Sequence, residues 1–257
     1  MAEGGIRVGT SGFDFERWRA GGFYPRSARP LLTWYAQRFG FVEVDSTFYG
    51  PPRPSTLERW CREVPASFRF SVKVPREITH ESAPDPAAAQ LRDLLLAAAE
   101  LEGKLACLLF QFPPRLRADP RLLEALLEAV PRGLPAAFEF RHPSWFTPSV
   151  ARRLLDSGKA FCATSVEQLE VLPAPGFCYL RLPGTGFSQP GLGHLRSTLE
   201  ARGFSESFVV FRDQARLDFP RDAWLFEQVV RPPQPQLWEK SGGSRTTRWI
   251  SSRNSSR

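Results

Sequence analysis

The chain has 257 residues, a net formal charge of +7 and a hydrophobic fraction of 42%. This length fits one large barrel or two small domains. No apolar run reaches the ~18 residues that a membrane-spanning helix needs. The first residues also lack the basic start and apolar stretch of a secretory signal. We therefore expect a cytoplasmic protein with no membrane partner.

The positive charge is concentrated at the C-terminal end of the chain. Residues 231–257 contain six basic residues and one acidic residue, which leaves about +2 for everything before them. Their Pro/Ser/Arg-rich composition predicts a disordered tail behind a barrel domain at 1–230. The near-neutral body argues against nucleic acid as the main partner, although the tail keeps RNA binding open as an alternative.

The cysteines give no sign of a metal site or a redox motif. None of the four belongs to a CxxC pair, and three of them lie in apolar, strand-like runs. A structural zinc site needs clustered ligands at short spacing. We expect buried, reduced thiols at Cys61, Cys107, Cys162 and Cys178.

Short strand-like runs alternate with helix-like segments along the chain. The predicted strands are Ile6–Thr10, Phe41–Asp45, Phe68–Val74, Leu105–Gln111, Ala136–Arg141, Ala160–Ala163, Phe177–Leu182 and Phe208–Arg212. The predicted helices are Pro30–Phe39, Pro54–Glu63, Ala87–Glu102, Pro120–Val130, Thr147–Ser157, Leu192–Arg202 and Asp222–Val230. Eight β/α units at roughly 30-residue spacing indicate a single (β/α)8 TIM barrel. An open doubly wound sheet is the structural alternative.

Alternation within the strands predicts a polar site. Side chains alternate between the two faces of a strand, and one face of a barrel strand points inward. In five strands the inward face carries polar residues towards the C-terminal end, where barrel enzymes keep their active sites. These inward polar residues are Glu43, Asp45, Arg69, Ser71, Lys73, Gln111, Glu139, Arg141, Tyr179 and Arg181.

Several long motifs, in order, resemble the YecE-like family, a group of (β/α)8 proteins of unknown biochemical role. They include GTSGF at 9–13, VEVDSTFYGPP at 42–52, FRFSVKVPREITH at 68–80, FEFRHPSW at 138–145 and YLRLPG at 179–184. The resemblance covers most of residues 6–184 and implies a barrel independently of the strand count.

The final third departs from the family pattern. Pro183 stands where the family has a histidine, and the last strand reads VVFRDQ instead of a YFNN-like end. An aspartate common in the sixth strand of the family is missing near Ala163–Ser165. The resemblance therefore implies an altered or weakened site in strands six to eight.

Glu43 and Glu139 are the leading acid–base candidates. A partly desolvated carboxylate at a strand end can have a pKa near neutrality and exchange protons. The structural alternative is that each pairs with a neighbouring cation, such as Lys73 or Arg141, as a buried scaffold. Lys73 is counted with the catalytic candidates.

Arg141 and Arg181 are candidates for binding an anion. A planar guanidinium can hold a phosphate or carboxylate through two parallel hydrogen bonds. The alternative is that these arginines neutralise the inward carboxylates Glu43, Asp45 and Glu139.

His80 and His142 follow strand ends within the family-like motifs and are candidates for proton transfer. A mixed His/carboxylate set can also bind a divalent metal, but neither histidine has an HxH or HExxH partner. We therefore assign no metal ligand and no cofactor, and keep a divalent metal as an alternative. His194 is expected at the surface.

Further candidates complete the predicted substrate-binding set. The aromatic residues Phe48, Tyr49 and Trp145 could form an apolar wall for a sugar or base ring, or they could anchor their loops. Ser11 lies in a glycine-containing turn whose backbone N–H groups could bind an anion. Asp45 and Gln111 join them from the inward strand faces. There is no P-loop lysine and no GxSxG elbow.

Three functions remain open. The first is an isomerase- or hydrolase-type enzyme that binds a small phosphorylated or carboxylated substrate and uses carboxylate acid–base chemistry. The second is metal-assisted phosphodiester hydrolysis. The third is a non-catalytic barrel that binds RNA or a protein through its basic tail.

Overall fold

A computed structural model describes residues 5–50, 52–80, 89–101 and 103–232. Its eight parallel strands pair in the order β1-β8-β7-β6-β5-β4-β3-β2. They are β1 (Gly5–Thr10), β2 (Phe41–Val44), β3 (Arg69–Lys73), β4 (Leu105–Gln111), β5 (Ala136–Glu139), β6 (Ala160–Ala163), β7 (Phe177–Leu182) and β8 (Glu206–Phe211). The predicted TIM barrel is confirmed.

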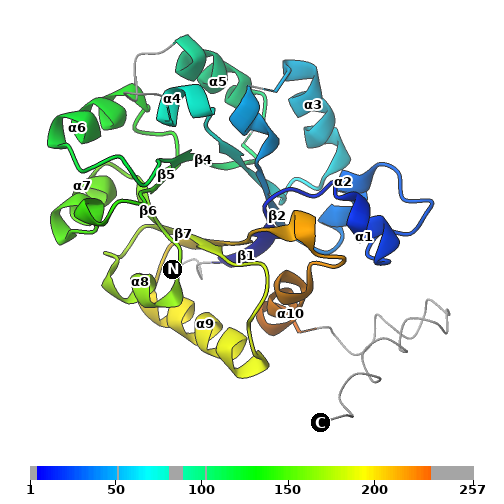
Figure 1. The fold of residues 1–257 in the computed structure, drawn as a ribbon. Coiled ribbons are helices and arrows are strands. Elements are labelled where there is room, and N and C mark those ends of the chain that lie inside the picture. Colours follow the sequence, from blue (N-terminus) through cyan, green and yellow to red (C-terminus); the bar gives the residue numbers. More distant parts are fainter. Residues whose placement is uncertain (1–4, 51, 81–88, 102, 233–257) are drawn as a thin grey trace.

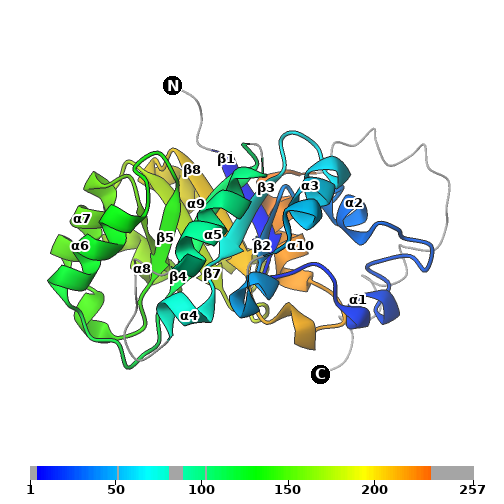
Figure 2. The ribbon, with the colours of Figure 1, turned by 90° about the horizontal axis from the view of Figure 1, so that it is seen from above.

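Helices surround the strands on all sides (Figure 1). The α-helices are α1 (Glu16–Ala20), α2 (Leu31–Ala36), α3 (Pro54–Glu63), α4 (Arg76–Thr79), α5 (Ala89–Ala99), α6 (Pro120–Ala129), α7 (Pro148–Asp156), α8 (Val166–Val171), α9 (Gln189–Arg202) and α10 (Arg221–Val230). Three 3₁₀ helices are η1 (Ser46–Tyr49), η2 (Pro143–Trp145) and η3 (Gln214–Arg216). Figure 2 shows α1 and α4, which follow β1 and β3, at the same end of the barrel. No helix of the described residues is long and apolar enough to span a membrane.

The strand ends differ from the sequence prediction where polar turns begin. β2 stops at Val44 because Asp45 starts the 3₁₀ turn η1, with the Phe48 N–H donating to the Asp45 carbonyl. β5 stops at Glu139, so Arg141 lies beyond the strand. The short helices α1, α4 and α8 were not predicted, since four to six residues carry too little periodicity. The predicted tail at 231–257 lies almost wholly outside the described residues.

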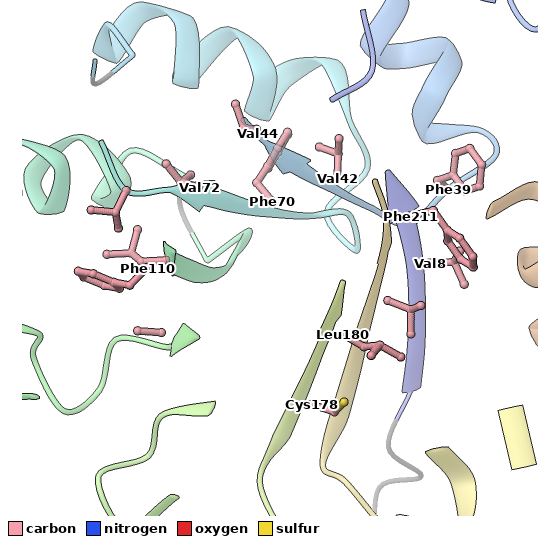
Figure 3. Close-up of a cluster of buried hydrophobic side chains, with 14 of the residues drawn as sticks. Val8, Phe39, Val42, Val44, Phe70, Val72, Phe110, Cys178, Leu180 and Phe211 are labelled. Carbon is pink, nitrogen blue, oxygen red and sulfur yellow. The ribbon is translucent and has the colours of Figure 1, made fainter. Parts of the chain in front are cut away.

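Strand parity divides the core into two layers. The larger cluster lies between the strands and the helices, and Figure 3 shows Val42 and Val44 of β2 and Phe70 and Val72 of β3 in it. The smaller cluster fills the barrel interior with residues that include Phe41, Cys107, Leu109, Ala137, Tyr179 and Phe208. The side chains that alternation predicted to point inward are therefore on the strand faces that fill the barrel interior. All four cysteines are buried and free, as predicted.

The contact between β1 and β2, which closes the barrel, differs from the ladders that join the other neighbouring strands. Instead of a regular ladder, an isolated parallel bridge joins Ser11 and Glu43. The Tyr35 hydroxyl of α2 spans the gap: it accepts from the Thr10 N–H at 2.9 Å and donates to the Phe41 carbonyl at 3.0 Å. Gly9 is required here because a Cβ would lie 2.2 Å from the Phe41 carbonyl oxygen. The Ser11–Glu43 bridge and the Tyr35 hydroxyl thus together join β1 to β2.

Candidate functional site

Arg181, on β7, is the centre of a charged network inside the mouth of the barrel. Its Nε and Nη2 donate to the carboxylate of Glu43 on β2, with an Nη2–Oε1 distance of 2.8 Å. Its Nη1 donates to Oε2 of Glu139 on β5. The side chain is only 3% exposed. Burial opposes its charge, but Glu43, Glu139 and Asp45 together raise the pKa of Arg181.

Tyr179 and Ser71 extend this network towards the barrel interior. The Tyr179 hydroxyl donates to Oε2 of Glu43 at 2.8 Å, and the Ser71 hydroxyl is in turn hydrogen-bonded to Tyr179. Glu43 thus accepts bonds from one cation and one hydroxyl, and it is fully buried. A carboxylate satisfied in this way is held in position and has little freedom to turn towards a ligand.

Glu139 is held as a carboxylate. Its Oε1 accepts from Gln111 Nε2 at 2.9 Å and from Arg141 Nε at 3.0 Å. Burial raises its pKa, but the charge and hydrogen bond of Arg181, with the bonds from Gln111 and Arg141, outweigh it and hold the pKa at about 2. This environment favours the scaffold alternative for Glu139 and Gln111 over proton exchange near neutral pH.

Asp45 has a different environment from the two glutamates. Its Oδ1 lies 3.8 Å from Arg181 Nη2 and 4.0 Å from Lys73 Nζ. This oxygen is buried without a hydrogen-bond partner among the described residues, while the side chain as a whole is 37% exposed. Burial and the neighbouring Glu43 raise the pKa of Asp45 to about 7, although Arg181 and Lys73 oppose the shift. Among the predicted candidates, Asp45 is the carboxyl suited to exchange a proton near neutral pH.

Beside Asp45, the ring of Phe48 contacts two titratable side chains, Lys73 and His80. Lys73 Nζ lies 4.1 Å from the centre of the Phe48 ring, and the His80 ring meets the same ring edge-on at 5.1 Å. Burial lowers the pKa of Lys73, and burial and nearby cations lower that of His80. Phe48 therefore acts as a spacer that holds a lysine and a neutral histidine close to one another.

A cleft of about 780 Å³ opens at the β1–β2 seam. It reaches from the strand ends at Ser11 and Asp45 outward between α2 and α3. Its wall combines apolar, acidic and basic side chains: Phe13, Phe15, Leu31, Trp60, Asp14, Glu63, Asp213, Arg19, Arg29 and Arg59. A ligand with both a polar and an apolar portion fits this lining.

Two backbone features shape the floor of the cleft. Asp213, just after β8, has φ of 59°, a left-handed conformation that a non-glycine residue adopts at a cost. Gly12 has φ of 85°, and its N–H donates to the Glu43 carbonyl at 2.8 Å. Ser11 is buried beside it and uses its N–H on the Phe211 carbonyl. The Ser11 N–H is therefore not available to an anion.

Other predicted residues lie apart from the network. His142 caps η2, where its Nδ1 accepts from the Ser144 N–H at 3.1 Å. Within the described part of the chain, no hydrogen bond or ion pair joins it to Glu43, Arg181 or Glu139. Trp145 is 1% exposed, stacks on Phe140 at 4.0 Å and donates to the Leu116 carbonyl. It is an anchor for the loop and has no free face for a ligand. The side chain of Tyr49 lies outside what the structure describes.

The described residues contain no group of three or more His, Cys, Asp or Glu side chains placed to hold a metal ion. His194 is exposed on α9. Pro183 is exposed directly after β7, where the family pattern has a histidine.

The cleft residues of α2 and α3 were missed by the sequence reasoning. Arg29 lies just before α2, Arg59 and Trp60 lie in α3, and none of the three carries a strand-end signal. The only signal for them in the sequence is that Arg59 and Trp60 are consecutive within the predicted helix Pro54–Glu63.

Comparisons with known proteins place the chain among relatives of the same fold. The family described as "Protein of unknown function DUF72" matches residues 7–245. The UPF0759 protein YunF of Bacillus subtilis is 31% identical over 145 residues, which are 53% of this chain and 51% of YunF. The UPF0759 protein YecE of Escherichia coli K12 is 29% identical over 127 residues, 48% of this chain and 46% of YecE. The aligned region thus spans about half the length of these relatives.

Two solved structures show the same barrel. A DUF72 family protein from Enterococcus faecalis superposes with a TM-score of 0.68 at 19% identity, covering 89% of this chain and 96% of that one. A DUF72 family protein from Thermotoga maritima gives 0.66 at 24% identity, covering 87% and 97%. These likenesses establish the fold alone.

Proposed function

Because the chain belongs to the YecE-like DUF72 family, a family of unknown function, we propose a function from its own site. We propose that it is an enzyme that binds a small anionic substrate in the β1–β2 cleft and transfers a proton through Asp45. The observation that carries the proposal is the position of Asp45, which lines the cleft and also contacts the buried Arg181–Glu43 pair.

The environment of Asp45 supports proton transfer. A general acid or base works best when its pKa lies near the operating pH, and burial beside Glu43 raises this pKa to about 7. Its side chain is 37% exposed and lines the cleft, whereas Glu43 and Glu139 are fully buried. The two glutamates and Arg181 form the scaffold that keeps Asp45 in this environment.

The charge balance at the mouth supports an anionic substrate. Glu43 and Glu139 offset Arg181 and Arg141, which leaves Lys73 as the counterion of Asp45. When Asp45 is protonated, Lys73 is uncompensated and the mouth carries a net positive charge. A phosphate or carboxylate on the substrate would restore neutrality next to the proton donor.

We favour acid–base chemistry because its groups lie in contact. Arg181 touches Glu43, Glu139 and Asp45, and Lys73 faces Asp45. Among the described residues, no group of side chains comparably favours metal-assisted hydrolysis. The tail that RNA or protein binding would use lies almost wholly outside them.

Deuterium exchange tests the proposal without knowledge of the product. The purified protein is incubated in D2O with a panel of phosphorylated and carboxylated sugars, and loss of carbon-bound protons is followed by ¹H NMR. We expect exchange with at least one compound. Asp45→Asn should slow it by a factor of roughly 10²–10⁴, the usual contribution of a general acid–base group.

Asp156→Asn, an exposed carboxyl on α7, is the matched control and should exchange at the wild-type rate. Absence of exchange across the panel would count against the proposal. Full exchange activity in Asp45→Asn would overturn it.

A further inference from the structure

We propose that the cations around His80, namely Lys73, Arg76, Arg115 and Arg141, bind the anionic group of the substrate as a dianion, with His80 taking up a proton when the anion binds. This inference rests on the proposed function, since it locates one end of the proposed substrate. It adds a subsite on the β3–β5 side of the mouth, next to the Asp45 end of the cleft. It also adds a chemical class, a phosphate or sulfate monoester.

The cations reach this subsite from four separate elements. Lys73 is the last residue of β3, Arg76 opens α4, Arg115 follows β4 and Arg141 follows β5. All four act on His80 as positive charges. Arg115 also donates to the His80 carbonyl, which ties the loop after β4 to the end of α4.

Arg141 has donors left for an anion. Its Nε is used by Glu139, and its two terminal nitrogens have no hydrogen-bond partner among the described residues. Its side chain is 40% exposed, compared with 3% for Arg181. A guanidinium held at Nε and open at its terminal nitrogens is positioned to donate two parallel bonds to a phosphate. The anion-binding alternative thus fits Arg141, whereas Arg181 is occupied by carboxylates.

His80 is oriented so that one defined nitrogen gains the proton. The Thr79 hydroxyl donates to the Pro75 carbonyl, so its oxygen can accept from Nδ1–H of His80, 2.8 Å away. This arrangement favours the neutral tautomer with the proton on Nδ1. Nε2, which has no partner among the described residues, is then the site of proton uptake.

The groups that face His80 explain why it is neutral without an anion. Burial, followed by Lys73, Arg141, Arg115 and Arg76, lowers the pKa of His80. The carboxyls that pair with two of these cations are Asp45, which faces Lys73, and Glu139, which faces Arg141. A bound dianion would reverse the local field and favour the imidazolium. A single carboxylate would do so less, because it brings half the charge.

Sulfate is the probe, because it remains a dianion between pH 5 and pH 8. Binding is measured by ¹H NMR of the three histidine rings at constant ionic strength, with sodium chloride replaced by sodium sulfate. We expect sulfate to raise the pKa of His80 by about one unit, and sulfate to bind about tenfold more tightly at the acidic end of the range than at pH 8. His194, exposed on α9, serves as the internal reference and should not shift.

Variants separate proton uptake from general charge attraction. Asp45 also titrates beside Lys73, so His80→Gln is compared in the Asp45→Asn background, where it should bind sulfate with no pH dependence. Arg141→Gln should weaken binding at every pH. Arg132→Gln, an exposed arginine in the loop before β5, is the matched control and should bind as the wild type does. Equal shifts of His80 and His194, or a pH dependence that persists in Asp45→Asn/His80→Gln, would overturn the inference. So would a response to sulfate no larger than the response to chloride.

The two proposals fail separately. If sulfate binds as described but no compound exchanges deuterium, the acid–base function of Asp45 is wrong and the anion subsite stands. If exchange depends on Asp45 but sulfate leaves His80 unchanged, the subsite is wrong and the proposed function stands. Asp45→Asn should retain sulfate binding.

Discussion

Arg181 and Glu43 face one another across the barrel interior, from β7 to β2, and form an ion pair through two points of contact. Nε lies 2.9 Å from Oε2 and Nη2 lies 2.8 Å from Oε1. Because the two strands are not neighbours in the sheet, this pair connects opposite walls of the barrel. Two-point geometry fixes the guanidinium plane, and that plane sets the positions of Glu139 and Asp45.

Replacing Arg181 with methionine should strongly destabilise the protein. The substitution leaves Glu43 buried without its cation and Glu139 with Arg141 alone, and loss of one partner from a buried pair costs about 3–5 kcal/mol. Urea unfolding followed by circular dichroism gives the change in the free energy of unfolding.

The double variant Arg181→Met/Glu43→Gln should recover part of this loss, because it removes one of the stranded charges. Arg153→Gln, which breaks the exposed pair with Glu124, is the control and should leave the unfolding midpoint nearly unchanged. A midpoint for Arg181→Met equal to that of the control would contradict the role we assign to the pair.

Glu139 should make the fold sensitive to acid. Its folded pKa of about 2 lies below the ordinary value of 4.5, so it contributes stability above pH 4.5 that is lost as the pH falls towards 2. The free energy of unfolding should therefore decline through this window. In Glu139→Gln the decline should be shallower, and parallel curves for the two proteins would show that Glu139 does not carry the effect.

Tyr35→Phe should weaken the β1–β2 seam. Loss of the hydroxyl leaves the buried Thr10 N–H and Phe41 carbonyl without a partner, at a cost of ~1–3 kcal/mol. Hydrogen exchange should show faster exchange at the Thr10 amide, while amides at the β3–β4 ladder remain protected at low denaturant. Uniform loss of protection around the barrel would indicate that Tyr35 does not act locally.

The inward face of the strands could be predicted from the sequence because the period of a strand is two. Glu43, Lys73, Glu139 and Arg181 were placed on one surface of the barrel by alternation alone, and the structure confirms this. Their pairing could not be predicted in the same way. Arg181 meets Glu43 across the barrel, and only the curvature of the closed sheet sets that distance.

The separate roles of the carboxyls also depend on three-dimensional contacts. Glu139 and Asp45 are both acidic residues at strand ends, yet Gln111 and Arg181 stabilise one charge while burial beside Glu43 opposes the other. No spacing along the chain carries this information. Trp145 shows the same limit, because its proline-flanked motif suits a ligand wall and a buried anchor equally.

The measurement that tests the account most directly is the titration of the Asp45 carboxyl by ¹³C NMR, with the signal assigned by comparison with Asp45→Asn. We predict a midpoint near pH 7, in keeping with a pKa raised by burial and Glu43, against an ordinary value of 3.8. Bound sulfate should leave this midpoint close to neutrality. A midpoint near pH 4 would contradict the central claim, because a carboxyl that is already ionised at neutral pH could not serve as the proton donor we propose.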